Sequence, residues 1–323
     1  MRRHFLKTVA LAALAFSYAA LAHAQTFRVA AANEAIDIVT ADDAYMRNLT
    51  PTDLSIRLQL RDGGTPEQLK AVYAAGVTVW SEAETARLTA LVERNSEKLA
   101  TLTAWLPESV LFIKGSRAID GGLPHTRANA IVFGPTLPAS DAGLESLFYH
   151  ELFHILSRHV NVAARESLYG LIGFERCSTV TLPPNLRGRA VSNPDVEDGA
   201  FTVEVEGGPE GTLDLMPFLT ANPERYDPSK PVFQSYFQLL FLNMKRGPRG
   251  ACSLVTVTGE SSIFPPAAVQ AALFKKVGRN TNYVFHAEET LADNFAFLMT
   301  GKSEVPDPWV LDKLRARLAL PPG

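Results

Sequence analysis

The chain has 323 residues, of which 46% are hydrophobic and 20% are charged, and its formal net charge is −3. This length and composition allow a globular protein with a sizeable core. The sequence shows no internal repeat and no block of basic residues, so the composition gives no reason to expect nucleic acid as a partner.

The first 24 residues have the three parts of a secretory signal peptide. A basic start, MRRHFLK, is followed by an apolar run over residues 9–21 and by a small-x-small sequence, Ala-His-Ala. We expect cleavage after Ala24 and a periplasmic or secreted protein. A membrane anchor is the alternative, although the apolar run is shorter than the roughly 20 residues of a spanning helix. Removing the three positive charges of this segment changes the net charge from −3 to −6.

Residues 25–323 are expected to form a single α+β domain. Short strand-like pieces such as TFRVAAA and LSIRLQL come first, and from Pro66 the pattern becomes helical. The helical parts are expected at about 66–175 and 264–320. Within the first part, strands are predicted at 108–116 and 129–133, and helices at 140–159 and 163–174. No stretch after the signal peptide is long and apolar enough to span a bilayer.

A β-rich insert is predicted between about residues 177 and 258. Its segments are rich in β-branched residues and are bounded by Gly, Pro, Asn and Asp, which is typical of an antiparallel sheet. The stretch VFQSYFQLLFLNM, residues 232–244, fits either a strand or a buried helix. Helices are expected again at 266–278, 286–301 and 307–320.

Cys177 and Cys252 are the two cysteines of the chain. In an oxidising compartment two thiols usually pair, and we predict one disulfide that stabilises the fold by about 3–4 kcal/mol. Two separate buried thiols are the alternative. Neither cysteine belongs to a CxxC pair, which argues against zinc ligation by these residues.

The stretch FYHELFHILSRH, residues 148–159, carries an HExxH motif. His150 and His154 are four residues apart, so on a helix both imidazoles share a face and can bind one zinc ion. Glu151 follows the first histidine and can accept a proton from the attacking water. The neighbouring apolar residues indicate a buried helix, in which these polar groups need a partner. A solvated polar edge of an amphipathic helix is the competing interpretation.

A catalytic zinc ion usually has three protein ligands, so a third is expected. His159 lies on a different face of its helix and is interpreted as a helix-end residue. In HAEETLADNFAFL, Glu289 is predicted as the third ligand and Asp293 as acceptor of a hydrogen bond from a ligating histidine. Glu288 is expected to point elsewhere, solvated or ion-paired, and His286 is a second-choice ligand or donor. A capped helix with acids in its first turn is the alternative.

The pentapeptides HELFH, residues 150–154, and ETLAD, residues 289–293, resemble the HExxH and ExxxD motifs of the gluzincin metallopeptidases, the thermolysin-like class. The resemblance implies a zincin-like core with zinc held by His150, His154 and Glu289. It also implies Glu151 as general base and Asp293 as support for a ligand. The 134 residues between His154 and Glu289 exceed the spacing in thermolysin itself, and the β-rich insert fills this interval.

The same resemblance concerns substrate binding. In gluzincins a sheet-edge strand before the HExxH helix pairs with extended substrate, and NAIVF is similar in position. Asn129 and Ala130 would then contact the substrate backbone by strand addition. A plain strand is the competing interpretation. The family also uses a Tyr or His to stabilise the oxyanion, for which Tyr283, His286 and Tyr169 are all candidates.

These observations predict an exported zinc-dependent metallopeptidase that hydrolyses peptide or protein substrates. A non-catalytic periplasmic binding protein on a zincin-like fold, with a structural or absent metal, is the alternative. In that case the β-rich insert would be the recognition surface. A purely structural secreted domain, without bound metal, is a third hypothesis.

Overall fold

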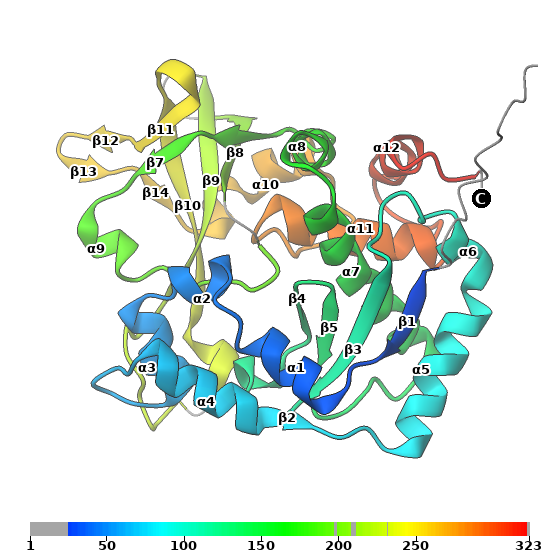
Figure 1. Cartoon of the computed structure of the whole chain (residues 1–323). Coiled ribbons are helices and arrows are strands. Elements are labelled where there is room, and N and C mark those ends of the chain that lie inside the picture. The colour runs from blue at the N-terminus through cyan, green and yellow to red at the C-terminus, as the bar shows by residue number, and fades with distance from the viewer. Residues whose placement is uncertain (1–24, 197–198, 208–210, 231, 322–323) are drawn as a thin grey trace, which may run out of the picture.

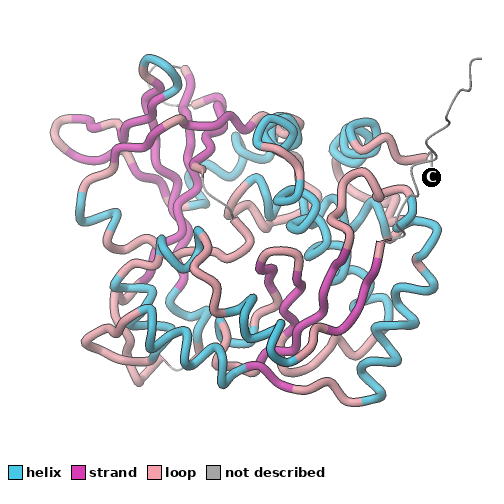
Figure 2. Tube along the Cα trace, viewed as in Figure 1, coloured by secondary structure: helices cyan, strands magenta, loops and turns pink. Residues whose placement is uncertain are grey.

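The computed structural model describes residues 25–196, 199–207, 211–230 and 232–321. The predicted signal peptide, residues 1–24, lies outside the described residues. Two main sheets lie on opposite sides of the molecule, and α7 and α11 lie near its centre (Figure 1). Helices and strands are both abundant (Figure 2), which confirms the predicted α+β class. None of the described helices has the length and apolar character needed to cross a membrane.

The described helices have the following bounds: α1 (Ala32–Val39), α2 (Ala44–Asn48), α3 (Pro51–Leu58), α4 (Pro66–Gly76), α5 (Glu82–Arg94), α6 (Ser96–Ala100), α7 (Asp141–His159), α8 (Val162–Gly170), α9 (Pro184–Arg187), α10 (Pro266–Val277), α11 (Ala287–Met299) and α12 (Trp309–Arg317), with short 3-10 turns η1 (Asp120–Gly122), η2 (Phe233–Tyr236) and η3 (Pro248–Gly250). The strands are β1 (Thr26–Val29), β2 (Val77–Thr78), β3 (Ser109–Gly115), β4 (His125–Arg127), β5 (Ala130–Phe133), β6 (Phe174–Cys177), β7 (Thr179–Thr181), β8 (Ala200–Glu206), β9 (Thr212–Ala221), β10 (Phe237–Arg246), β11 (Ala251–Leu254), β12 (Thr256–Val257), β13 (Glu260–Ser261) and β14 (Ile263–Phe264).

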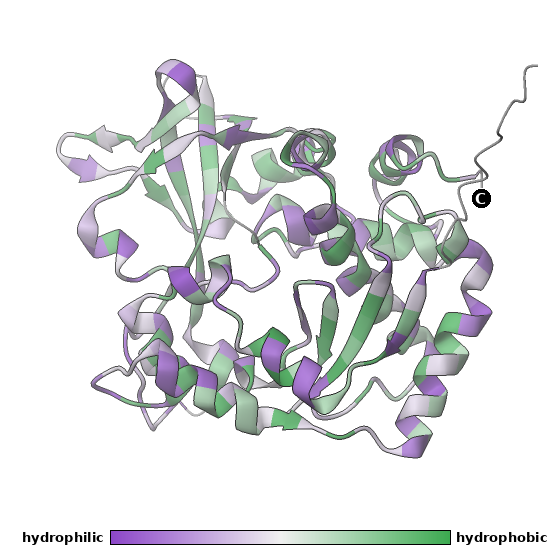
Figure 3. Cartoon of the chain, viewed as in Figure 1, coloured by the Kyte–Doolittle hydropathy of each residue, from purple (hydrophilic) through white to green (hydrophobic). Residues whose placement is uncertain are grey.

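The first sheet has the strand order β1-β3-β5-β4, and β2 pairs with β3. β1, β3 and β5 are parallel, whereas β4 is antiparallel to β5. Val110 and Phe112 of β3 join the main core with α7 and α11, while Leu111 and Ile113 join a second core with α1 and α4. Helices therefore cover both faces, which is why β3 and β5 are hydrophobic along their length (Figure 3).

The second sheet has the order β6-β8-β9-β10-β11-β7, with β14 paired to β10. It is antiparallel except for the β11–β7 pair. It corresponds to the predicted β-rich insert, extended by a few residues at each end. The disulfide between Cys177 and Cys252 joins β6 to β11, as predicted, and both sulfurs lie in the small core of this sheet.

The two helices that carry the predicted site motifs lie side by side (Figure 1). Ser140 caps the start of α7, and its hydroxyl accepts a hydrogen bond from the N–H of Gly143. His286 caps the start of α11, and its ring accepts a backbone hydrogen bond in the first turn. Buried side chains join the helices: the rings of Phe153 and Phe295 have centroids 5.6 Å apart. Caps thus define where each helix starts, and apolar packing fixes their separation.

Two sequence interpretations change in the structure. LSIRLQL, residues 54–60, is not a strand, because most of it belongs to α3. Thr50 and Asp53 form a capping box at the start of this helix, with Pro51 in its first turn, and these local signals outweigh the alternating pattern that suggested a strand. The undecided stretch 232–244 forms η2 and most of β10.

The disulfide closes a loop with a sequence separation of 75 residues. We expect the double variant Cys177→Ala/Cys252→Ala to lose about 4 kcal/mol of unfolding free energy, since the unfolded chain regains the entropy of the open loop. Urea denaturation of parent and variant measures this difference. As a control, reducing agent should lower the midpoint of the parent and leave that of the variant unchanged. Equal midpoints for parent and variant would contradict a stabilising role.

Candidate metal centre

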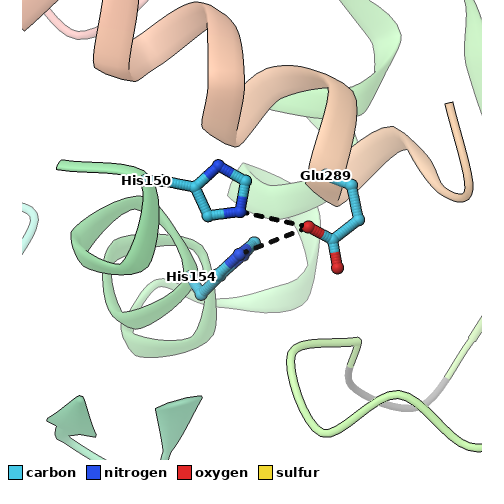
Figure 4. A group of neighbouring side chains, drawn as sticks. All are labelled: His150, His154 and Glu289. Carbon is cyan, nitrogen blue, oxygen red and sulfur yellow. Dashed lines mark ion pairs between the residues drawn. The ribbon is translucent and has the colours of Figure 1, made fainter. Parts of the chain in front are cut away.

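Three side chains from two helices converge on one point (Figure 4). His150 and His154 lie one turn apart on α7, and Glu289 extends from the first turn of α11. Glu289 Oε2 lies 3.3 Å from His150 Nε2 and 3.6 Å from His154 Nε2. Ligand atoms of all three lie within 4.8 Å of one another. Two motifs that are remote in the chain therefore form one site, and their predicted convergence is confirmed.

The spacing of these atoms fits a divalent metal ion. Ligand atoms at zinc–ligand distances of about 2.0–2.1 Å in a tetrahedral site are about 3.3 Å apart. Among the described residues, His154 Nε2 and Glu289 Oε2 are buried without a hydrogen-bond partner. Leaving a buried polar atom unsatisfied costs about 1–3 kcal/mol. A cation bound between the three side chains would satisfy both atoms, so the residues fit a metal ion.

Carboxylates of α11 orient both imidazoles. His150 Nδ1 lies 2.9 Å from Asp293 Oδ1, and His154 Nδ1 lies 2.9 Å from Glu288 Oε1. An ionised carboxylate accepts hydrogen bonds, so each Nδ1 is the donor, and in the neutral ring each Nε2 has the lone pair that a metal ion would need. Asp293 therefore occupies the position predicted for it, and it also accepts a hydrogen bond from Thr281.

The expectation that Glu288 points away from the site is wrong. Its side chain is fully buried and, besides His154, contacts two hydroxyl groups, those of Ser157 and Tyr169, which donate to it. α8 packs against the start of α11 and supplies the tyrosine, while α7 supplies the serine. The side chains of both glutamates in this turn thus face other helices. Glu288 contacts Nδ1 of His154, whereas Glu289 lies near Nε2 of the same ring.

The loop before β8 contributes to the site. Asn193 donates a hydrogen bond from its amide to Glu289 Oε1, which leaves Oε2 directed at the histidines. Burial alone would raise the pKa of Glu289, but the positive charges of His154 and His150 outweigh this effect and lower it to about 2. Glu289 is therefore an ionised carboxylate held at one oxygen and available at the other. The sequence offered no motif that signals Asn193.

Glu151 is the other buried carboxylate of the HExxH segment. It is 3% exposed, and its Oε2 has no hydrogen-bond partner among the described residues. Burial and the nearby charge of Asp195 raise the pKa of Glu151 to about 8. Asp195 is held by Thr126, which donates from its backbone N–H at 2.6 Å and from its hydroxyl at 2.8 Å. Sequence analysis missed Asp195, which comes from an irregular loop.

A cleft of about 770 Å³ gives solvent and ligands access to the site. His150, Glu151, Asp195 and Tyr283 line it. The turn before β4 and the β9–β10 connection of the second sheet both line the cleft. A buried acid with a raised pKa beside a cluster of potential metal ligands, in a cleft of this size, is typical of a functional site.

The three tyrosine and histidine candidates for an oxyanion donor lie in different places. Tyr283 lines the cleft and stacks on the His150 ring, with centroids 5.9 Å apart. Burial raises its pKa, so its hydroxyl stays protonated and can donate. Tyr169 already donates to Glu288. His286 caps α11 and lines another cavity, outside the ligand cluster, and burial lowers its pKa to about 4.

The structure contradicts strand addition at Asn129 and Ala130. β5 lies between β3 and β4, so both of its edges already carry sheet hydrogen bonds. Ala130 is fully buried, and the Asn129 amide donates to Ser109. The edge position belongs to β4, a three-residue strand within the segment that the sequence analysis left unassigned between its two predicted strands. Strand pairing across the sheet, which local pattern does not encode, decides which strand is at the edge.

Comparison with known proteins assigns no family: no protein-family model, no curated protein and no solved structure matches the chain. The resemblance to the gluzincins therefore stays a prediction that rests on two motifs. The donor atoms, their distances and their burial are the basis for any statement about function.

The role of the two clustered imidazoles in metal binding can be tested with a third histidine on the same helix as the control. We expect His150→Ala and His154→Ala to lose the bound metal, because each removes one of three ligand atoms. His159→Ala should retain it, since His159 lies exposed at the end of α7. Metal analysis of the purified proteins, after loading with zinc and removal of the excess, gives the stoichiometry. Equal metal content in all variants would contradict the site.

Metal binding should depend on pH. Burial opposes protonation of His154, but the charges of Asp195 and Glu289 outweigh it and raise the pKa to about 9 in the metal-free protein. The bound proton thus stabilises the metal-free fold below the ordinary pKa of 6.5, and this contribution is lost as the pH rises through about 9.

A metal ion takes the place of that proton, so binding should release protons. We expect added zinc to raise the thermal midpoint more near pH 9 than near pH 6, as measured by scanning calorimetry of the same protein at both values. The Glu289→Gln variant, which lacks a charged ligand, serves as control and should show a much smaller shift. A zinc-induced shift in the parent that is independent of pH would contradict this coupling.

Proposed function

We propose that this protein is an exported zinc-dependent metallopeptidase with a gluzincin-like catalytic core. One observation carries the proposal. The imidazoles of His150 and His154 and the carboxylate of Glu289 converge on one point, where His154 Nε2 and Glu289 Oε2 lack hydrogen-bond partners among the described residues, next to the buried Glu151 and at the wall of a cleft. Two histidines and one glutamate are a known ligand set of catalytic zinc, and three protein ligands leave one position open.

Zinc would supply Lewis-acid polarisation of the scissile carbonyl and would lower the pKa of the attacking water. Glu151 would accept a proton from that water and return it to the leaving amine. Its environment suits this exchange, because a carboxyl with a pKa of about 8 is poised between its two forms near neutral pH. Tyr283, which stacks on His150, would donate a hydrogen bond to the oxyanion.

The disulfide supports the proposed location. A pair of cysteines that is oxidised in the folded protein indicates an oxidising compartment. Together with the signal-peptide pattern of residues 1–24, it favours the periplasm or the exterior. The net negative charge favours peptide or protein over nucleic acid as substrate.

One substitution can distinguish the role of the proposed base from that of the metal ligands. Glu151→Gln should keep zinc and lower kcat for peptide hydrolysis by roughly 10²- to 10⁴-fold, because the amide cannot accept the proton. Glu145→Gln is the matched control: it lies on the same helix, pairs with Lys98 and does not line the cleft. A digest of a peptide library with and without chelator, followed by mass spectrometry, gives the rates.

The outcomes distinguish the hypotheses. A chelator-sensitive parent with an inactive Glu151→Gln variant supports the peptidase. Equal rates for parent and variant would show that Glu151 is not the base. Peptides that bind the zinc-loaded parent but are never cleaved would instead support the non-catalytic binding protein.

A further inference from the structure

The cleft contains a second pair of unpartnered buried atoms, separate from the metal centre. Asp120 Oδ2 and His125 Nε2 lie 3.7 Å apart, and the two side chains are 4% and 3% exposed. Neither atom has a hydrogen-bond partner among the described residues. Both residues line the same cleft as His150 and Glu151. Two adjacent polar atoms left unsatisfied at a cleft wall indicate a place where a ligand group binds.

The hydrogen bonds around His125 define the chemistry of that ligand group. His125 Nδ1 lies 3.0 Å from the carbonyl oxygen of Leu123. A carbonyl oxygen only accepts, so Nδ1 carries the proton, and Nε2 of the neutral ring is an acceptor. Asp120 Oδ2, a carboxylate oxygen, is also an acceptor. The pair therefore requires a donor that can reach two acceptors at once.

Asp120 shares Arg57, the cation that donates a hydrogen bond to it, with a second carboxylate. Its Oδ1 accepts hydrogen bonds from Arg57 Nε at 3.0 Å and from the Tyr45 hydroxyl at 2.8 Å. Arg57 also forms a buried ion pair with Asp53. One guanidinium thus faces two carboxylates. Burial raises the pKa of Asp120, but the charge of Arg57 outweighs this effect and keeps the pKa below its ordinary value, so the carboxyl is ionised.

We propose that Asp120 and His125 form a subsite for a primary ammonium group, either the N-terminus of a peptide or a lysine side chain. An ammonium group has three compact donors, so it can bond to Oδ2 and Nε2 together, and its positive charge is attracted to the Asp120 carboxylate. A metal ion fits less well, because in the described part of the chain this pair belongs to no group of three metal-ligating side chains. That the ammonium belongs to a cleaved peptide rests on the proposed function.

Small amines test the subsite without any cleavage. The probes are alaninamide, which mimics a peptide N-terminus, n-butylamine, which mimics a lysine side chain, and N-acetylalaninamide, which has no cation. We expect one or both amines to shift the His125 ring resonances in the NMR spectrum of the full chain, and the acetylated probe to leave them unchanged. The amine that binds more tightly identifies the source of the ammonium group. The absence of a shift with either amine would overturn the proposal and leave a structural water as the occupant.

Two conservative variants make the test specific. Asp120→Asn keeps Oδ1 for Arg57 and replaces the Oδ2 acceptor with a donor, and asparagine tolerates the left-handed backbone at this position, φ 44°. His125→Asn keeps an amide donor for Leu123 O, and its shorter side chain has no acceptor at the position of Nε2. Because each substitution removes one hydrogen bond to the charged amine, each should weaken amine binding roughly tenfold or more. Asp312→Asn on α12, exposed and outside the cleft, changes the net charge equally and should leave binding unchanged.

Three peptides of otherwise equal sequence link the subsite to turnover: one with a free N-terminus and no lysine, one acetylated with lysine, and one acetylated with norleucine in its place. A preference for a cationic peptide in kcat/KM that Asp120→Asn abolishes supports the subsite. Cleavage without such a preference, together with no amine binding, overturns the subsite and leaves the peptidase standing. Amine binding without any cleavage supports the subsite and rejects the peptidase.

Discussion

The candidate site depends on the hydrogen bonds between the imidazoles of α7 and the carboxylates at the start of α11. Each of these imidazoles donates from Nδ1 to an acid on the other helix, to Asp293 for His150 and to Glu288 for His154. These bonds select the tautomer that directs both Nε2 atoms at Glu289. If the two helices moved apart by one side-chain layer, the ligand cluster and the orientation of the rings would be lost together.

When so many ionisable groups are buried between two helices, each carboxylate oxygen needs a hydrogen-bond donor or a nearby positive charge. Glu288 has three side-chain donors and Glu289 is held by Asn193 on one oxygen, whereas His154 Nε2 and Glu289 Oε2, which face the common point, lack hydrogen-bond partners among the described residues. The apolar residues of both helices surround this polar group and belong to the main core. A polar network of this kind is favourable only when every member is satisfied, which a cation between the histidines and Glu289 would achieve.

The long interval between the two motifs supplies one side of the cleft. The loop before β8 contributes Asn193 to the candidate metal centre and Asp195 to the surroundings of Glu151. The β9–β10 connection of the second sheet also lines the cleft, as does the segment that carries Asp120 and His125. Unpartnered atoms thus occur in two places, at the candidate metal centre, whose His150 lines the cleft, and at the Asp120–His125 pair within the cleft. A substrate that reached both would be fixed in orientation before the reaction.

The sequence alone determined the features that depend on short spacing. Helix caps such as Ser140, the shared helical face of His150 and His154, and the disulfide cysteines follow from local periodicity and composition. Only the tertiary structure decided that Glu288 is turned inward, that β4 takes the sheet edge, and that Asp120 lies beside His125. These outcomes depend on which elements pack together, and the energies that select a packing arise from contacts between residues far apart in the chain, where no local pattern records them.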